Sequence, residues 1–239
     1  MIKLAQLSDL HLLAEPSAVR WDLRPQQLFD EVLALALQQQ PDALLLTGDL
    51  VHDESHAGYR RLAQQLAATQ LPVLAIPGNH DDPALIRQHF GEAELSLNGV
   101  TVIGLDTHIH GSDCGFLGSD QIARLAKLLA ASTQPCLVVL HHPPVTVGSR
   151  WIDELGLADA DDLARCLEAH TDNVIALLSG HVHQDFTGVF AGKPILSCPS
   201  TNRQFAPGAS EFATEPVAPG FRLCEIKNGT LSSAVLRLS

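Results

Sequence analysis

The sequence predicts an α/β fold whose main sheet is mostly parallel and whose C-terminal part is antiparallel. Short apolar runs of β type alternate with segments of helical periodicity through most of the chain, a pattern typical of βαβ units. After residue 186 only short β-like segments separated by turn residues follow. A length of 239 residues suits one hydrophobic core, so we expect a single domain over residues 1–239.

Three strands and two helices are predicted in the first part of the chain. Apolar residues at helical spacing, followed by Pro41, predict a helix over residues 24–39. A second helical pattern covers residues 56–69, and either Asp53 or Ser55 could be its N-cap. The strands are expected at residues 2–7, 43–46 and 71–76.

The middle of the chain continues this alternation. Residues 119–131 form a helical pattern for which Ser119 is the expected N-cap, and residues 161–170 form another. Strands are expected at residues 100–105, 136–140 and 174–178. The connections therefore predict parallel pairing within this region.

The C-terminal part is expected to be antiparallel. Asn228-Gly229 is a strong signal for a two-residue hairpin turn. Residues 203–220 contain several Pro and Gly and predict a long irregular loop, which in a compact domain is usually functional or mobile. The short β-like segments lie at residues 187–190, 194–197, 221–227 and 231–238.

Charge and composition limit the classes of molecule that this protein is expected to bind. A formal net charge of −12 argues against a surface that binds long nucleic acid, but a small phosphate ester stays possible because bound cations reverse the local field. Five cysteines without a close pair suit a reducing compartment. With neither a signal peptide nor an apolar run of about 20 residues in view, we expect a cytoplasmic protein that does not enter membranes.

Three polar motifs follow the first three predicted strands. Asp9 and His11, two residues apart in a segment expected to be extended, would point to one side and hold one ion. Asp49, after Gly48, could bridge two cations, although both aspartates could instead cap turns or helices. Pro77-Gly78-Asn79-His80-Asp81 offers an amide oxygen, a titrating imidazole and a carboxylate that could orient that imidazole.

Two histidine pairs follow later strands. His141 and His142 precede two prolines, which places them on a stiff turn. His181 and His183 would face the same way in an extended segment, and histidine is the commonest metal ligand. An exposed histidine pair beside a loop is the alternative for His141 and His142.

Together the motifs favour a metal site. All of them fall at the carboxyl ends of predicted strands, where parallel α/β sheets bind ligands. Carboxylate, imidazole and amide ligands without thiolates suit Zn, Mn or Fe. Seven or eight candidate ligands are too many for one ion and about right for two.

The series of motifs resembles the calcineurin-like metallophosphoesterases, and it spans nearly the whole chain. The order, the spacing and the segments Ser200-Thr201 and 219–222 resemble the class III cyclic nucleotide phosphodiesterases and their glycerophosphodiesterase relatives. The resemblance implies a four-layer α/β/β/α sandwich of two mixed sheets flanked by helices. It also implies one metal held by Asp9, His11 and His183, a second held by Asn79, His141 and His181, and Asp49 between them.

The implied activity is hydrolysis of a small phosphodiester, with 3′,5′-cyclic AMP as the first substrate to test. Two ions would activate a bridging water for in-line attack. We expect His80 to protonate the leaving alkoxide or stabilise the transition state, with Asp81 as its partner, and Asn79 to contact metal and phosphate. Substrate contacts are expected from Asn79, His80, His183 and Arg203.

Other interpretations stay open. The same metals could serve a glycerophosphodiesterase, a 2′,3′-cyclic nucleotide phosphodiesterase or a phosphomonoesterase, and a binding module without catalysis is a further alternative. Arg203 could bind phosphate or base, or be a solvated loop residue. Trp21 and Trp151 could line the mouth of the site or anchor packing. The apolar C-terminal stretch could form a homodimer or finish a sheet.

Overall fold

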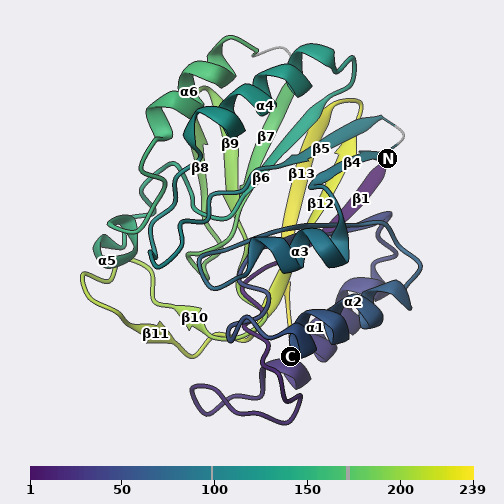
Figure 1. Cartoon of the computed structure of the whole chain (residues 1–239), viewed down its shortest axis with the longest axis vertical. Coiled ribbons are helices and arrows are strands. Elements are labelled where there is room, and N and C mark those ends of the chain that lie inside the picture. The colour runs from purple at the N-terminus through teal and green to yellow at the C-terminus, as the bar shows by residue number, and fades with distance from the viewer. Residues whose placement is uncertain (98, 171–172) are drawn as a thin grey trace.

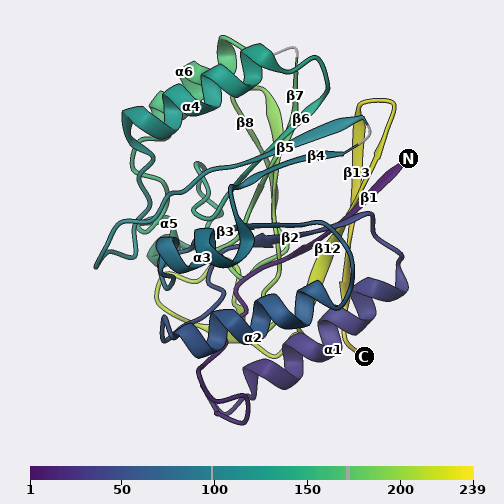
Figure 2. The same cartoon turned by 45° about the vertical axis from the view of Figure 1, so that its right-hand side comes forward.

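A computed structural model describes residues 1–97, 99–170 and 173–239. Two mixed β-sheets pack face to face, with helices on both outer sides (Figures 1 and 2). The implied four-layer arrangement is thus what the structure shows. Among the described residues, no helix combines the length and the apolar character needed to cross a lipid bilayer.

Each sheet takes strands from distant parts of the chain. The first sheet has the order β13-β12-β1-β2-β3 and consists of β1 (Ile2–Leu7), β2 (Ala43–Thr47), β3 (Val73–Ile76), β12 (Gly220–Lys227) and β13 (Thr230–Arg237). The second has the order β4-β5-β6-β7-β9-β8 and consists of β4 (Glu94–Leu97), β5 (Val100–Gly104), β6 (Cys136–Leu140), β7 (Val174–Ser179), β8 (Thr187–Phe190) and β9 (Lys193–Ser197).

The helices form the outer layers. The first sheet is covered by α1 (Pro25–Gln38), α2 (His56–Ala67) and α3 (Pro83–Phe90), and the second by α4 (Gly118–Ala131) and α6 (Ala160–Glu168). The short helix α5 (Arg150–Asp153) lies apart from both layers (Figure 1).

Alternating side chains of the strands fill the spaces between layers. In β2, Leu44 and Leu46 pack against the helices of the first sheet, whereas Leu45 points between the two sheets. In β6, Val138 faces α4 and α6 while Val139 faces the first sheet. Because both faces of these strands are buried, their sequences read as continuous apolar runs rather than alternating ones.

The strand register places the site. β1, β2 and β3 are parallel, as are β5, β6 and β7, so the carboxyl ends of each set lie along one edge. The predicted hairpin is confirmed, with Asn228 at φ 53° and Gly229 at φ 74° between β12 and β13. The antiparallel expectation fails only for β9, which pairs parallel with β7 after the β8–β9 hairpin places β8 at the sheet edge.

Several elements were not foreseen. Helix α3 has a recognisable signal, because the Asp82 carboxylate accepts from the backbone of Ala84 at 2.8 Å, Pro83 starts the helix and Gly91 follows it. The segment 203–220 is not wholly irregular, since β10 (Gln204–Phe205) and β11 (Thr214–Glu215) form a two-stranded hairpin within it. The strand β4 and the helix α5 are the other additions.

The N-termini of α2 and α4 are capped differently. Ser55 rather than Asp53 caps α2, because its Oγ accepts from Gly58 N at 3.3 Å. The expectation that Ser119 caps α4 is wrong. The Asp159 carboxylate, from the chain before α6, instead accepts from Gly118 N at 2.8 Å and from Leu117 N at 3.0 Å. A residue distant in sequence therefore caps this helix.

Replacing Asp159→Ala should lower the free energy of unfolding by about 1–2 kcal/mol, because the amides at the start of α4 lose their acceptor. Urea denaturation followed by circular dichroism measures this loss. Ser119→Ala is the matched control and should stay within about 0.5 kcal/mol of the unchanged protein. A larger loss from Ser119→Ala than from Asp159→Ala would contradict the assignment.

Candidate metal centre

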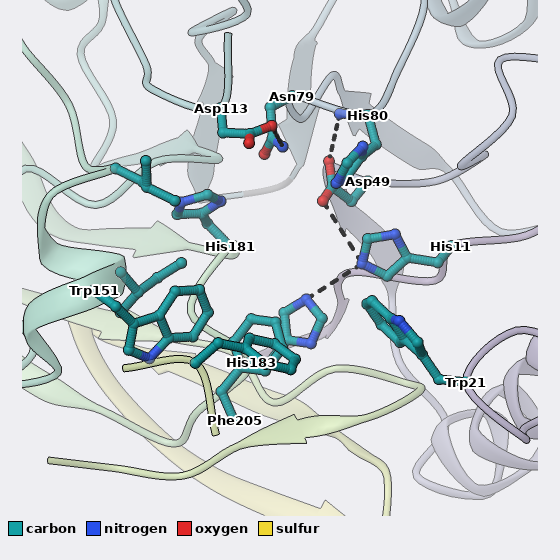
Figure 3. A pocket seen from close by; sticks show the side chains of 13 residues that line it. His11, Trp21, Asp49, Asn79, His80, Asp113, Trp151, His181, His183 and Phe205 are labelled. Carbon is teal, nitrogen blue, oxygen red and sulfur yellow. Dashed lines mark hydrogen bonds and ion pairs between the residues drawn. The ribbon is translucent and has the colours of Figure 1, made fainter. Parts of the chain in front are cut away.

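The residues predicted as ligands meet at one edge of the two sheets. Asp9 and His11 follow β1, Asp49 follows β2, and Asn79 follows β3, all from the first sheet. The second sheet contributes the histidines that follow β6 and β7, namely His141, His181 and His183. Figure 3 shows five of them, His11, Asp49, Asn79, His181 and His183, around a common pocket, whereas Asp9 and His141 do not line it. The carboxylates and imidazoles among them are all at least 95% buried.

The backbone at these positions differs from the expected extended conformation. Asp9, His11, Asp49, His181 and His183 have φ of 55°, 47°, 55°, 69° and 48°. The left-handed region costs a residue other than glycine about 1 kcal/mol or more. The side chains of each pair therefore reach the site through successive sharp bends rather than through strand alternation, and the surrounding structure must hold these bends.

The first group of ligand atoms surrounds the Nε2 atom of His183. Its Nδ1–H donates to the Arg203 carbonyl at 2.6 Å, which leaves Nε2 with a lone pair. That Nε2 lies 3.3 Å from Asp9 Oδ1 and 3.3 Å from His11 Nε2. His11 Nε2 is in turn 3.7 Å from Asp49 Oδ2. The Nε2 lone pair of His183 thus faces the Asp9 carboxylate inside a buried volume.

A second group surrounds His141. Its Nδ1–H donates to the Thr47 carbonyl at 2.8 Å, so Nε2 again carries a lone pair. This atom lies 3.4 Å from Asp49 Oδ1 and 3.2 Å from Asn79 Oδ1. Asp113, which the sequence analysis did not foresee, accepts from Asn79 Nδ2 at 3.1 Å and so turns the amide oxygen toward His141.

These residues fit two cations. Ligands bound at 2.0–2.2 Å to one ion lie about 3 Å apart, close to the separations seen here. The Nε2 of His181 is buried without a hydrogen-bond partner, as expected for a ligand atom. Opposed lone pairs and carboxylates of this kind are costly to bury unless positive charge lies between them. Asp49 presents one oxygen to each group, which suits a bridging ligand.

The pKa values of the site follow from the same burial. Burial lowers the pKa of His11 and His181 well below the usual value, so both rings stay neutral and able to bind metal. Burial opposes charge on His141 as well, but Asp49 and Asp9 raise its pKa overall. Burial favours protonation of Asp9, yet His183 holds its pKa below the ordinary value.

His142 differs from its neighbour. Its Nδ1 forms a 2.7 Å hydrogen bond with Thr107 Oγ1, and its Nε2 is buried without a partner. The ring lies 4.5 Å from that of His181. His141 faces both Asp49 and Asn79, but His142 lies in one group of possible metal ligands with His141 and His181, so the choice of His141 as the ligand stays a prediction.

The expected role of Asp81 needs correction. Its buried carboxylate accepts hydrogen bonds from the backbone N–H of Leu50, Val51 and Gly78 and from the Tyr59 hydroxyl. It is therefore committed to joining the two loops and does not orient His80. Burial, with a smaller effect of Asp49, raises the pKa of Asp81 to about 7, whereas its four donors favour the carboxylate.

His80 has a different neighbour from the one expected. Its backbone N–H donates to Asp49 Oδ1 at 3.0 Å, and its ring lies 4.3 Å from that of His52. Burial, with the charges of His80 and Arg20, lowers the pKa of His52 to about 4, so that this ring is neutral. His52 follows β2 by several residues, and its sequence context gave no signal for this contact.

Arg203 differs from the substrate contact expected, whereas His183 lines the pocket and its contact with substrate stays a prediction. The Arg203 guanidinium donates to the Trp21 carbonyl and lies 5.6 Å from the Trp21 ring, and Arg203 is absent from the pocket wall. The Arg203 backbone carbonyl also accepts the Nδ1–H of His183. Arg203 thus fixes His183 and the Trp21 loop instead of reaching into the pocket.

We expect His141→Ala to lower the metal content of the protein from two ions to about one per chain, because one ion loses an imidazole ligand. Elemental analysis by mass spectrometry after dialysis measures the content. His142→Ala is the matched control and should keep both ions. If His142→Ala loses an ion and His141→Ala keeps both, His142 rather than His141 is the ligand.

Comparisons with known proteins agree with this geometry. Residues 2–185 match the family described as calcineurin-like phosphoesterase. A probable cyclic nucleotide phosphodiesterase of Synechococcus sp. is 36% identical over 210 residues, which cover 85% of this chain and 82% of that protein. The 3′,5′-cyclic adenosine monophosphate phosphodiesterase CpdA of Escherichia coli (strain K12) is 32% identical over 249 residues, covering 100% and 90%.

Solved structures share the fold at low sequence identity. A dimetal phosphatase from Danio rerio superposes with a TM-score of 0.72 at 12% identity, covering 98% of this chain and 95% of that one. A purple acid phosphatase from yellow lupin gives 0.64 at 13% identity, covering 99% and 51%. The chain belongs to the calcineurin-like phosphoesterase family and is a metal-dependent phosphoesterase.

Proposed function

We propose that this protein is a two-metal phosphodiesterase that hydrolyses a small cyclic nucleotide, with 3′,5′-cyclic AMP as the first candidate. The observation that carries the proposal is Asp49, whose two oxygens face two separate sets of ligand atoms. The names of the curated relatives supply the substrate class.

The ligand sets follow from the facing atoms. One ion would be held by Asp9, His11 and His183, and the other by Asn79, His141 and His181, with Asp49 shared. The chemistry of the donors suits Mn, Fe or Zn. Two ions held there would supply a nucleophilic hydroxide near neutral pH and would neutralise charge on the phosphate.

The remaining chemistry falls to groups at the pocket wall. His80 and Asn79 line the cavity of about 160 Å³ together with His11, Asp49, His181 and His183. His80 is the candidate that would protonate the leaving alkoxide, since it lines the pocket, adjoins Asp49 and belongs to neither proposed ligand set. Asn79, oriented by Asp113, holds its amide at the same wall, where it would contact both metal and phosphate.

The decisive experiment is an assay of the protein loaded with Mn, Fe or Zn. We expect turnover of bis(p-nitrophenyl) phosphate exceeding that of p-nitrophenyl phosphate, release of AMP from 3′,5′-cyclic AMP, and loss of both activities on chelation. Glycerophosphodiesters and 2′,3′-cyclic AMP are the alternative substrates in the same assay. Absence of diester turnover with every metal would refute the proposal.

His80→Ala should lower kcat for 3′,5′-cyclic AMP by about 10²- to 10⁴-fold, because the departing alkoxide loses its proton donor. The loss on bis(p-nitrophenyl) phosphate should be much smaller, since p-nitrophenolate leaves without protonation. Steady-state kinetics on both substrates measures the difference. His56→Ala, at an exposed position, is the control. Equal losses on the two substrates would contradict the acid role.

A further inference from the structure

The pocket has a second wall that the metal chemistry does not use. Opposite His11 and Trp21, the side chain of Trp151 borders the cavity (Figure 3). Trp151 belongs to α5, and it contacts two phenylalanines of the β10–β11 hairpin. We call Trp151, Phe205 and Phe212 the aromatic wall. The curated names and the ligand motifs assign no role to it.

The three rings of the aromatic wall pack edge to face. Trp151 lies 5.0 Å from Phe205 and 5.2 Å from Phe212, and the two phenylalanines are 5.5 Å apart, with interplanar angles between 71° and 77°. This is a favourable geometry for aromatic pairs. The Ser149 hydroxyl, next to α5, accepts from Gly208 N at 2.9 Å and ties the hairpin loop to this helix. The wall is therefore preorganised.

Phe205 joins this wall to the metal centre. Its ring stacks on that of His183 at 3.9 Å with an interplanar angle of 6°. Phe205 is only 6% exposed, so it backs the wall, while Phe212 keeps 56% of its surface open. One aromatic ring thus separates the metal ligand His183 from Trp151. In a nucleotide, one sugar ring likewise separates the phosphate from the base.

The opposite tryptophan is less suited to a ligand. The Arg20 guanidinium lies 3.9 Å from the centre of the Trp21 ring, and the Arg203 guanidinium lies 5.6 Å from it. Side chains of the protein thus already occupy the surface of Trp21. Trp151 and Phe212 are the aromatic groups that remain for a ligand.

The wall offers contact area but few hydrogen bonds. Ile152 and Leu155 border it, whereas Asn79, His80 and Asp113 lie with the metal ligands. The indole N–H of Trp151 is buried and has no hydrogen-bond partner. Stacking tolerates different bases because every base has a π face, and specificity for one base requires polar readout.

We propose that Trp151 and Phe212 hold the base of the nucleotide by stacking, so that the site takes nucleotides without discriminating adenine from guanine. This inference rests on the proposed function and names the part of the pocket that would select nucleotides over base-free phosphodiesters.

Binding to the manganese-loaded protein tests this proposal without requiring turnover. Isothermal titration calorimetry would compare AMP, GMP and ribose 5-phosphate, which has the sugar and phosphate but no base. We expect AMP and GMP to bind with similar affinity, and both roughly 5- to 150-fold more tightly than ribose 5-phosphate, the range that stacking on aromatic side chains provides.

Variants of the wall should remove this preference. Phe212→Ala and Trp151→Leu should bring the affinity for AMP toward that for ribose 5-phosphate, which should itself stay unchanged. Phe116→Ala is the matched control, because Phe116 is 48% exposed and borders a groove between α4 and α6. If Trp151→Leu also loses ribose 5-phosphate, Phe212→Ala decides, since its exposed ring contributes little to folding.

The outcomes separate this inference from the proposed function. Equal binding of AMP and ribose 5-phosphate, an unchanged preference in Phe212→Ala, or strong discrimination between AMP and GMP would overturn the base site. A base preference without hydrolysis of any diester would support the base site while refuting the phosphodiesterase. Hydrolysis of 3′,5′-cyclic AMP without a base preference would support the phosphodiesterase while refuting the base site.

Discussion

The structure depends on one electrostatic constraint, the convergence of lone pairs and carboxylates in a buried volume. Asp9 and His183, like Asp49 and His141, face each other at 3.3–3.4 Å with acceptor atoms. Such an arrangement is stable only with positive charge between the groups. Neighbouring glycines allow the close approach, because a Cβ at Gly48 would lie 2.4 Å from His141 Nδ1. Cations bound between these groups would therefore stabilise the fold of these loops.

Two backbone carbonyls extend this constraint outward. Thr47, at the end of β2, fixes the tautomer of His141, and Arg203, beside β10, fixes that of His183. The first of these hydrogen bonds joins one sheet to the other. The packing of the two sheets therefore fixes the orientation of the His141 ring. Asp81 serves the same end by tying the loops after β2 and β3 together. The packing of the core thus determines the positions of the site residues.

The pocket divides its walls between two kinds of interaction. Charged and polar groups lie where a phosphate would bind, and the aromatic wall lies beside them across Phe205. The hairpin that carries Phe205 and Phe212 joins neither main sheet, and a two-stranded ribbon is marginal by itself. Its order depends on contacts with Trp151, His183 and Ser149. Changes in this hairpin would therefore alter the pocket without disturbing the sheets.

The sequence by itself determined the alternation of strands and helices and the ligand motifs at the strand ends, because periodicity and turn residues are local signals. Only the tertiary structure decided that Asp9 and His183 bend through left-handed backbone, that Asp159 caps α4, and that Asp81 joins loops. The contacts of Arg203 with Trp21 and His183 were likewise not predictable from the sequence. Each of these features depends on groups far apart in the chain. Packing brings these groups together, and the spacing of residues in the sequence does not reveal it.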